Sequence, residues 1–269
     1  MQPKGPAAYV AELIGTFLLV VFIGFILASN SPAEGGGLGF TDFAVIGLLH
    51  AFVLMMLIAS LGGVSGAHFN PAVTLTLAAL RKISWGDAAV YMLLQLAGAV
   101  LAALTVKLIV TGSAEATNFG ATAVNDRFMS SDGAAALAEL IGTFTLMWAI
   151  MGVAVNPEAD RSWAPWVIGG TLGFAVMALG PFTGAGLNPA RAFGPALVGN
   201  AFGGADTFII VYLLAPLVGA LLAGSAYHAL VLAPQGLRGE RPVDKLEVGA
   251  AERASRPEER PARPSDSGP

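Results

Sequence analysis

The chain has 269 residues, of which 55% are hydrophobic and only 12% are charged, and its mean hydropathy is +0.70. Soluble domains carry about 25% charged residues, so this composition excludes an ordinary soluble protein and indicates helices that cross a membrane. The small net charge of −4 disfavours a nucleic-acid partner, and the absence of Cys excludes disulfides, thiol chemistry and cysteine-based metal sites.

Apolar residues gather into six segments that are long enough to cross a bilayer as helices. In chain order, the predicted spans are Ala7–Ala28, Thr41–Gly62, Asp87–Thr111, Gly133–Val155, Trp163–Gly180 and Asp206–Leu232. Two shorter apolar runs follow the second and the fifth span, and they end near Leu80 and Gly199. Ten helical residues are about 15 Å long, so each short run reaches only the middle of a hydrocarbon core about 30 Å thick.

Each short run opens with the same three residues, which form a strong helix-start signal. They are Asn70, Pro71 and Ala72 in the first run, and Asn188, Pro189 and Ala190 in the second. Asn is a favoured N-cap, and Pro at the first helical position loses no hydrogen bond because its amide would have no partner there. The sequence therefore predicts two half-length helices, each beginning at its asparagine.

The hydrophobic part of the chain is one unit used twice. Residues Ala11–Phe17 recur letter for letter as Ala138–Phe144, and the two Asn-Pro-Ala boxes lie 118 residues apart. Each unit holds three spans, an odd number, so the second copy must cross the membrane in the opposite direction to the first. We predict an all-α membrane protein with six transmembrane helices and two re-entrant half-helices, arranged in two inverted repeats.

The chain divides into a long hydrophobic part and a short polar tail. We place a transmembrane channel domain at residues 1–232, with repeat one at about 7–111 and repeat two at about 133–232. Residues 233–269 are rich in Pro, Arg, Glu and Ser, which predicts a disordered tail. Arg and Lys favour the side that holds both termini, so both termini are expected in the cytoplasm. The composition, which is rich in Ala, Gly and Pro, suggests a multi-pass protein of a bacterial inner membrane.

The inverted arrangement brings Asn70 and Asn188 face to face at the middle of the membrane, each at the positive end of a half-helix dipole. Each side-chain oxygen caps its own helix, which leaves the amide NH₂ to donate hydrogen bonds into a lumen. Two such donors orient a passing water molecule, and the two dipoles repel cations and protons. This pattern favours a passive channel for a neutral solute in single file. Such a channel is not an enzyme and needs no cofactor or metal.

These residues resemble the major intrinsic proteins, the family of aquaporins and glycerol facilitators. The resemblance covers about residues 7–232 and rests on the paired boxes, the repeated Ala-Glu-x-x-Gly-Thr-Phe, Ser-Gly-Ala-His before the first box and Ala-Arg-x-Phe-Gly-Pro after the second. It implies that Glu12 and Glu139 hold the re-entrant loops through hydrogen bonds, and that His68 braces the first loop from the cytoplasmic side. A homotetramer with one pore per subunit is implied in the same way.

The resemblance also implies an outer constriction of four residues, located by their spacing from the boxes. They are His50, Val176, Ala185 and Arg191. This set matches neither the strict water channels nor the glycerol facilitators of the family, and it looks closest to the vacuolar-membrane subfamily of plants. Val176 and Ala185 are small, which predicts a constriction wider than a water-only filter. Ala192 and Ala196 stand where glycerol facilitators have Asp and a basic residue, which favours water.

We therefore predict a channel in a lipid bilayer for water and for small neutral solutes, with glycerol, urea or ammonia as the alternative main cargo. A secondary transporter also uses inverted repeats and broken helices, but Glu12 and Glu139 are its only acidic candidates at the midplane. Ser65 and His228 imitate the nucleophile and base of an intramembrane serine protease. Thr183 at the matching position of repeat two instead explains Ser65 as a close-packing residue. Nothing in the short loops favours an adhesive role.

Overall fold

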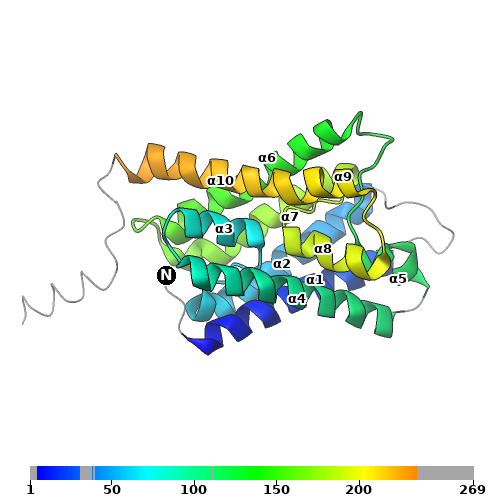
Figure 1. Cartoon of the computed structure of the whole chain (residues 1–269), viewed down its shortest axis with the longest axis horizontal. Helices are drawn as coiled ribbons and strands as arrows, with labels where there is room; N and C mark the ends of the chain where they lie inside the picture. The colour runs from blue at the N-terminus through cyan, green and yellow to red at the C-terminus, as the bar shows by residue number, and fades with distance from the viewer. Residues whose placement is uncertain (1–4, 31–37, 39, 111, 235–269) are drawn as a thin grey trace, which may run out of the picture.

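The computed structural model describes residues 5–30, 38, 40–110 and 112–234, and every regular element over these residues is a helix (Figure 1). The α-helices are α1 (Pro6–Asn30), α2 (Phe40–Ser65), α3 (Pro71–Ala79), α4 (Trp85–Ile109), α5 (Ser113–Ala116), α6 (Asp132–Ile150), α7 (Ala164–Thr183), α8 (Pro189–Gly199), α9 (Ala205–Thr207) and α10 (Ala215–Tyr227). The 3₁₀ turns are η1 (Asn118–Gly120) and η3 (Arg161–Trp163), and the π-helical turns are η2 (Met151–Val155), η4 (Phe208–Leu214) and η5 (His228–Leu232). Most of the predicted tail, residues 235–269, lies outside the described residues.

Six helical segments are long and apolar enough to cross a membrane, which confirms the predicted spans. They are Pro6–Asn30, Thr41–Ser65, Trp85–Ile109, Asp132–Val155, Arg161–Thr183 and Ala205–Leu232. The observed ends differ from the predicted ends by no more than three residues. The agreement is close because each span is bounded by charged or turn-forming residues that cannot remain in hydrocarbon without a partner.

Two half-length helices, α3 and α8, begin at the asparagines as predicted. The side-chain oxygen of Asn70 accepts a hydrogen bond from the amide of Ala72, and that of Asn188 accepts from the amides of Ala190 and Arg191. In Figure 1 the cyan α3 and the yellow α8 approach each other from opposite ends of the bundle. The two half-helices therefore enter from opposite sides and meet at their N-termini.

Close packing between α2 and α7 joins the two repeats and depends on glycine. A Cβ at Gly169 would lie 2.7 Å from the carbonyl oxygen of Ala51, and one at Gly173 would lie 2.8 Å from that of Gly47. Small residues let helix backbones approach in membranes, where packing replaces the hydrophobic drive between helices. The Gly-x-x-x-Gly pattern of α7 therefore serves contacts inside one chain.

The last span departs from a uniform α-helix at Pro216. Because Pro216 has no amide hydrogen, the carbonyl of Tyr212 loses its ordinary α-helical donor. The chain forms the π turn η4 just before this point, and the amide of Ala215 bonds to the carbonyl of Ile210. Tyr212 itself is buried, with 1% of its surface exposed, and it belongs to the functional site.

Exposed tryptophans mark one end of the bundle. Trp85, Trp163 and Trp166 each expose 60% of their surface, and they stand where α4 and α7 begin. Tryptophan prefers the level of the lipid headgroups, so these residues fit a membrane interface. The N-terminal end of α1 and the end of the orange α10 lie toward this same end of the molecule in Figure 1.

Candidate functional site

The two re-entrant loops share a backbone conformation that few side chains adopt. Gly66 and Gly184 have φ values of +92° and +72°. Ala67 and Phe69 in the first loop, and Ala185 and Leu187 in the second, also have positive φ values between 46° and 52°. A left-handed residue other than Gly costs about 1–2 kcal/mol, so both loops need strong tertiary support.

Glu12 on α1 supports the first loop from inside the membrane. Its Oε1 accepts hydrogen bonds from the hydroxyl of Ser65 at 2.6 Å and the amide of His68 at 3.0 Å. Its Oε2 accepts from the amide of Phe69 at 2.8 Å and from Nε2 of Gln95 at 2.8 Å. The carboxylate is fully buried, and its lone pairs are occupied by donors of the loop and of α4.

Glu139 on α6 repeats this arrangement in the second loop. It accepts from the hydroxyl of Thr183 at 2.6 Å, and from the amides of Gly186 at 2.8 Å and Leu187 at 2.7 Å. The described contacts give it three donors, whereas Glu12 has four. Pro216 stands at the position in repeat two that corresponds to Gln95, and it has no donor to offer.

Each re-entrant loop also accepts a hydrogen bond from one buried tyrosine. The hydroxyl of Tyr91 donates to the carbonyl of Ser65 at 2.9 Å, and that of Tyr212 donates to the carbonyl of Thr183 at 2.8 Å. Both rings are almost fully buried. Comparison of the repeats pairs these tyrosines, but the sequence alone assigns them no role. A buried tyrosine generally needs a partner for its hydroxyl, and that rule is the signal that points to them.

Asn70 and Asn188 each bind the loop of the opposite repeat. Nδ2 of Asn70 donates to the carbonyl of Leu187 at 2.9 Å, and Nδ2 of Asn188 donates to the carbonyl of Phe69 at 2.8 Å. An amide nitrogen carries two hydrogens, so each side chain has one further N–H beyond this bond. The sequence predicts that the amide NH₂ of each asparagine donates into a lumen, and the structure shows that one N–H of each instead bonds between the repeats.

A second set of polar side chains surrounds the first half-helix. Nε2 of Gln95 donates to Oγ1 of Thr74 at 2.9 Å, and Oγ1 of Thr74 lies 3.0 Å from the carbonyl of Asn70. Nδ1 of His68 lies 3.1 Å from the same Thr74 oxygen. Sequence reasoning did not select Gln95 or Thr74. An amide inside a predicted span was nevertheless a usable signal, because polar groups at membrane depth are costly without partners.

The four predicted constriction residues are all buried. Val176 exposes 1% of its surface, His50 and Ala185 expose 2%, and Arg191 exposes 3%. Arg191 reaches away from the half-helix, and its Nη1 donates to the carbonyl of Gly120 at 2.7 Å. Gly120 follows two residues with positive φ, Asn118 and Phe119, so a strained turn presents this carbonyl.

Two buried nitrogen atoms of the predicted constriction residues have no hydrogen-bond partner. Nδ1 of His50 lies 2.7 Å from the carbonyl of Ile46, and because a carbonyl only accepts, Nδ1 carries the hydrogen. In the neutral ring, Nε2 is then an acceptor, and it has no partner. Nε of Arg191 is a donor and also has no partner. A molecule that both donates and accepts hydrogen bonds has the chemistry to satisfy groups of these two kinds.

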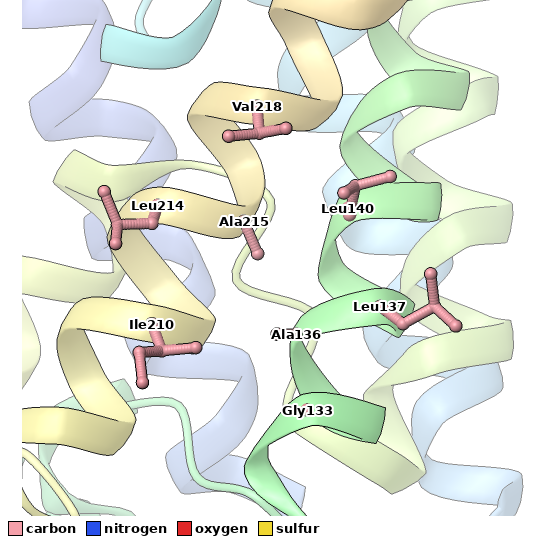
Figure 2. A pocket seen from close by; sticks show the side chains of 8 residues that line it. All are labelled: Gly133, Ala136, Leu137, Leu140, Ile210, Leu214, Ala215 and Val218. Carbon is pink, nitrogen blue, oxygen red and sulfur yellow. The ribbon is translucent and has the colours of Figure 1, made fainter.

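A shallow apolar hollow lies outside this site, between α6 and the η4–α10 segment, and Figure 2 shows it. Its lining is Gly133, Ala136, Leu137, Leu140, Ile210, Leu214, Ala215 and Val218. These residues carry no polar side chain, and none of them belongs to the loops or to the constriction. The hollow is a feature of the apolar outer surface.

Comparisons with known proteins agree with the fold. A sequence profile of the family described as Major intrinsic protein matches residues 2–227. The chain is 38% identical over 238 residues to Aquaporin AqpM of Methanothermobacter thermautotrophicus, covering 82% of this chain and 96% of that protein. It is 37% identical to the probable aquaporin NIP4-2 of Arabidopsis thaliana, covering 85% and 76%.

A solved structure has a similar fold. The X-ray structure of the aquaglyceroporin from Plasmodium falciparum has a TM-score of 0.69 and 25% sequence identity, and the match covers 85% of this chain and 97% of that one. The chain therefore belongs to the major intrinsic protein family, whose members are channels and not enzymes.

Proposed function

We propose that the chain is a passive channel that conducts water in single file and excludes ions and protons. The observation that carries this proposal is the meeting of the two half-helices, where Asn70 and Asn188 hold each other's loops and each keeps one N–H. Two donors at the positive ends of two dipoles bind the oxygen of water and disfavour a cation at the same point.

The constriction supports water as the main solute. The unpaired acceptor of His50 and the unpaired donor of Arg191 suit a molecule that offers both a hydrogen and a lone pair. Val176 and Ala185 are small, but both are buried, with 1% and 2% of their surfaces exposed, and close packing around them would narrow the passage. A narrow passage favours water over a longer polyol.

A small neutral solute is the second candidate for the main cargo. The solved neighbour is described as an aquaglyceroporin, and the short side chains of Val176 and Ala185 leave room once their neighbours move. Glycerol, urea and ammonia all donate and accept hydrogen bonds, so they also suit the unpaired groups of His50 and Arg191. Their passage requires the constriction to widen.

The proposal includes an orientation and an assembly. The chain spans a cell membrane several times, with both termini in the cytoplasm, because Arg81, Lys82 and Arg161 fall on that side and Arg127 on the other. Residues 1–232 form the channel domain. A homotetramer with one pore in each chain matches the family to which the chain belongs.

The proposal is tested by osmotic measurements on proteoliposomes. We expect vesicles with the protein to shrink faster than empty vesicles after a jump in sucrose, when light scattering is followed by stopped flow. A jump in glycerol or urea is expected to give the same shrinkage with little re-swelling. Rapid re-swelling would show that the small solutes pass through the channel, and would favour them over water as the main cargo. Folded protein with no gain in either rate would contradict a channel.

Replacing Arg191 with Val is expected to admit protons and small cations. The substitution removes the fixed positive charge of the constriction, and a change of about 1.4 kcal/mol in a barrier alters a rate tenfold. We expect proton leak, read from a pH-sensitive dye inside the vesicles, to rise about tenfold while water flux persists. Arg127→Val is the matched control, since Arg127 is exposed, and it should keep the wild-type leak. Equal leak in both variants would contradict a barrier role for Arg191.

A further inference from the structure

The two halves of the conducting site are not supported alike, and the difference centres on Thr74. In repeat two, Gly186 stands in the place of His68, Ala192 in the place of Thr74 and Pro216 in the place of Gln95. The second copy therefore lacks all three polar side chains of this cluster, which are His68, Thr74 and Gln95. The second loop nevertheless has its left-handed backbone and its three hydrogen bonds to Glu139. The additional groups of repeat one are thus not required to form a re-entrant loop.

The orientation of the Gln95 amide follows from its partners. Oε2 of Glu12 can only accept, so the group 2.8 Å from it must be the NH₂ of Gln95. The same nitrogen then gives its second hydrogen to Oγ1 of Thr74 at 2.9 Å. Oε1 of Gln95 faces the other way, is buried and has no partner. The side chain is fully buried. In this orientation both N–H groups donate hydrogen bonds, and the amide oxygen is left without a donor.

The Thr74 hydroxyl connects the Gln95 amide to the turn that carries Asn70. A hydroxyl has one hydrogen and two lone pairs. Its hydrogen points to the carbonyl of Asn70, and Gln95 occupies one of its lone pairs. The remaining lone pair faces Nδ1 of His68 at 3.1 Å, so Nδ1 carries the hydrogen and Nε2 of the neutral ring is an acceptor.

We propose that Gln95 is a positioning residue of the channel, which acts through Thr74 to fix the turn that carries Asn70 and the tautomer of His68. It does not touch the solute. Its amide holds the Thr74 hydroxyl in one direction, and that direction sets the hydrogen on His68 and the position of the Asn70 carbonyl. The proposal rests on the proposed water conduction for its functional consequence only, because the tautomer can be observed without any flux.

Gln95→Met is the sharpest test, because methionine fills the space and removes both donors. We expect water permeability per channel to fall about three- to tenfold, the range that corresponds to one lost hydrogen bond. The melting temperature in detergent should remain near the wild-type value. Glu12 keeps three donors, the number that Glu139 has, and the unpaired oxygen of Gln95 is removed as well. Full permeability in this variant would overturn the proposal.

Variants of Thr74 test whether Gln95 acts on Asn70 and His68 through the Thr74 hydroxyl. Thr74→Val should lower permeability as Gln95→Met does, and the double variant should be no worse than the poorer single variant. Thr74→Ser keeps the hydroxyl and should restore permeability to within about twofold. Thr105→Val is the matched control, since the Thr105 hydroxyl on α4 bonds only to its own helix, and it should leave permeability unchanged. Losses that multiply in the double variant would overturn the path through Thr74.

A spectroscopic readout separates this proposal from the conduction proposal. Ring ¹⁵N shifts in protein labelled at its three histidines should show His68 with its hydrogen on Nδ1 in the wild type. The same signal should change in Gln95→Met and in Thr74→Val, and remain in Thr105→Val. A His68 tautomer with the hydrogen on Nε2 in the wild type would overturn the positioning role, whether or not the vesicles conduct water.

Discussion

Glu139→Leu is expected to abolish the folded channel. The substitution leaves the hydroxyl of Thr183 and the amides of Gly186 and Leu187 without an acceptor in a site that holds no exposed surface. Each unpaired buried donor costs about 1–3 kcal/mol, and the three together approach the total stability of a typical domain, about 5–15 kcal/mol. The left-handed residues of the loop add their own cost once the carboxylate is removed.

The yield of monodisperse protein in detergent, and its melting temperature, check this expectation. Glu139→Gln keeps the shape and one acceptor but turns an NH₂ toward donors, so it should give an intermediate loss. Glu158→Leu makes the same change at an exposed position in the loop before η3 and should leave yield and melting temperature unaltered. A stable Glu139→Leu protein with wild-type melting would mean that the loop keeps its conformation without the carboxylate.

Gly194→Ala is expected to have the second largest effect. A Cβ at Gly194 would lie 2.4 Å from the backbone carbon and oxygen of Ala99, so α8 cannot accept it without moving away from α4. Overpacking of this kind costs about 1–3 kcal/mol. Gly194 lies one turn after Arg191 on the same half-helix, so the displacement also shifts the guanidinium.

Two measurements on one protein separate the effects of this substitution. We expect a lower melting temperature in detergent, and water permeability per folded channel reduced severalfold. Gly63→Ala adds the same methyl group to a helical glycine with open space around it, and alanine favours the helix, so it should be neutral or slightly stabilising. If Gly194→Ala and Gly63→Ala melt alike, the contact between α8 and Ala99 is looser than the structure indicates.

Residues that act within their own segment were predictable from the sequence. The six spans and the half-helices starting at Asn70 and Asn188 follow from apolar run lengths and from capping chemistry, and both agree with the structure. The inversion of the repeats follows from an odd number of spans. These features depend on hydration and on local backbone geometry, which the residues of one segment determine by themselves.

Residues that act across the fold were not predictable in the same way. Arg191 bonds to the carbonyl of Gly120, which belongs to a turn far away in the chain, and no residue pattern encodes that pairing. Gln95 and Thr74 come together only when α4 packs beside α3.

The exchange of hydrogen bonds between the two boxes has the geometry of a two-fold symmetric dimer. Asn70 binds the residue before Asn188, and Asn188 binds the residue before Asn70, so each half gives what it receives. Isologous contacts between identical subunits have this reciprocity. The two covalently joined halves thus meet as two subunits of a symmetric dimer would, and Pro216 in the place of Gln95 marks a point where the halves differ.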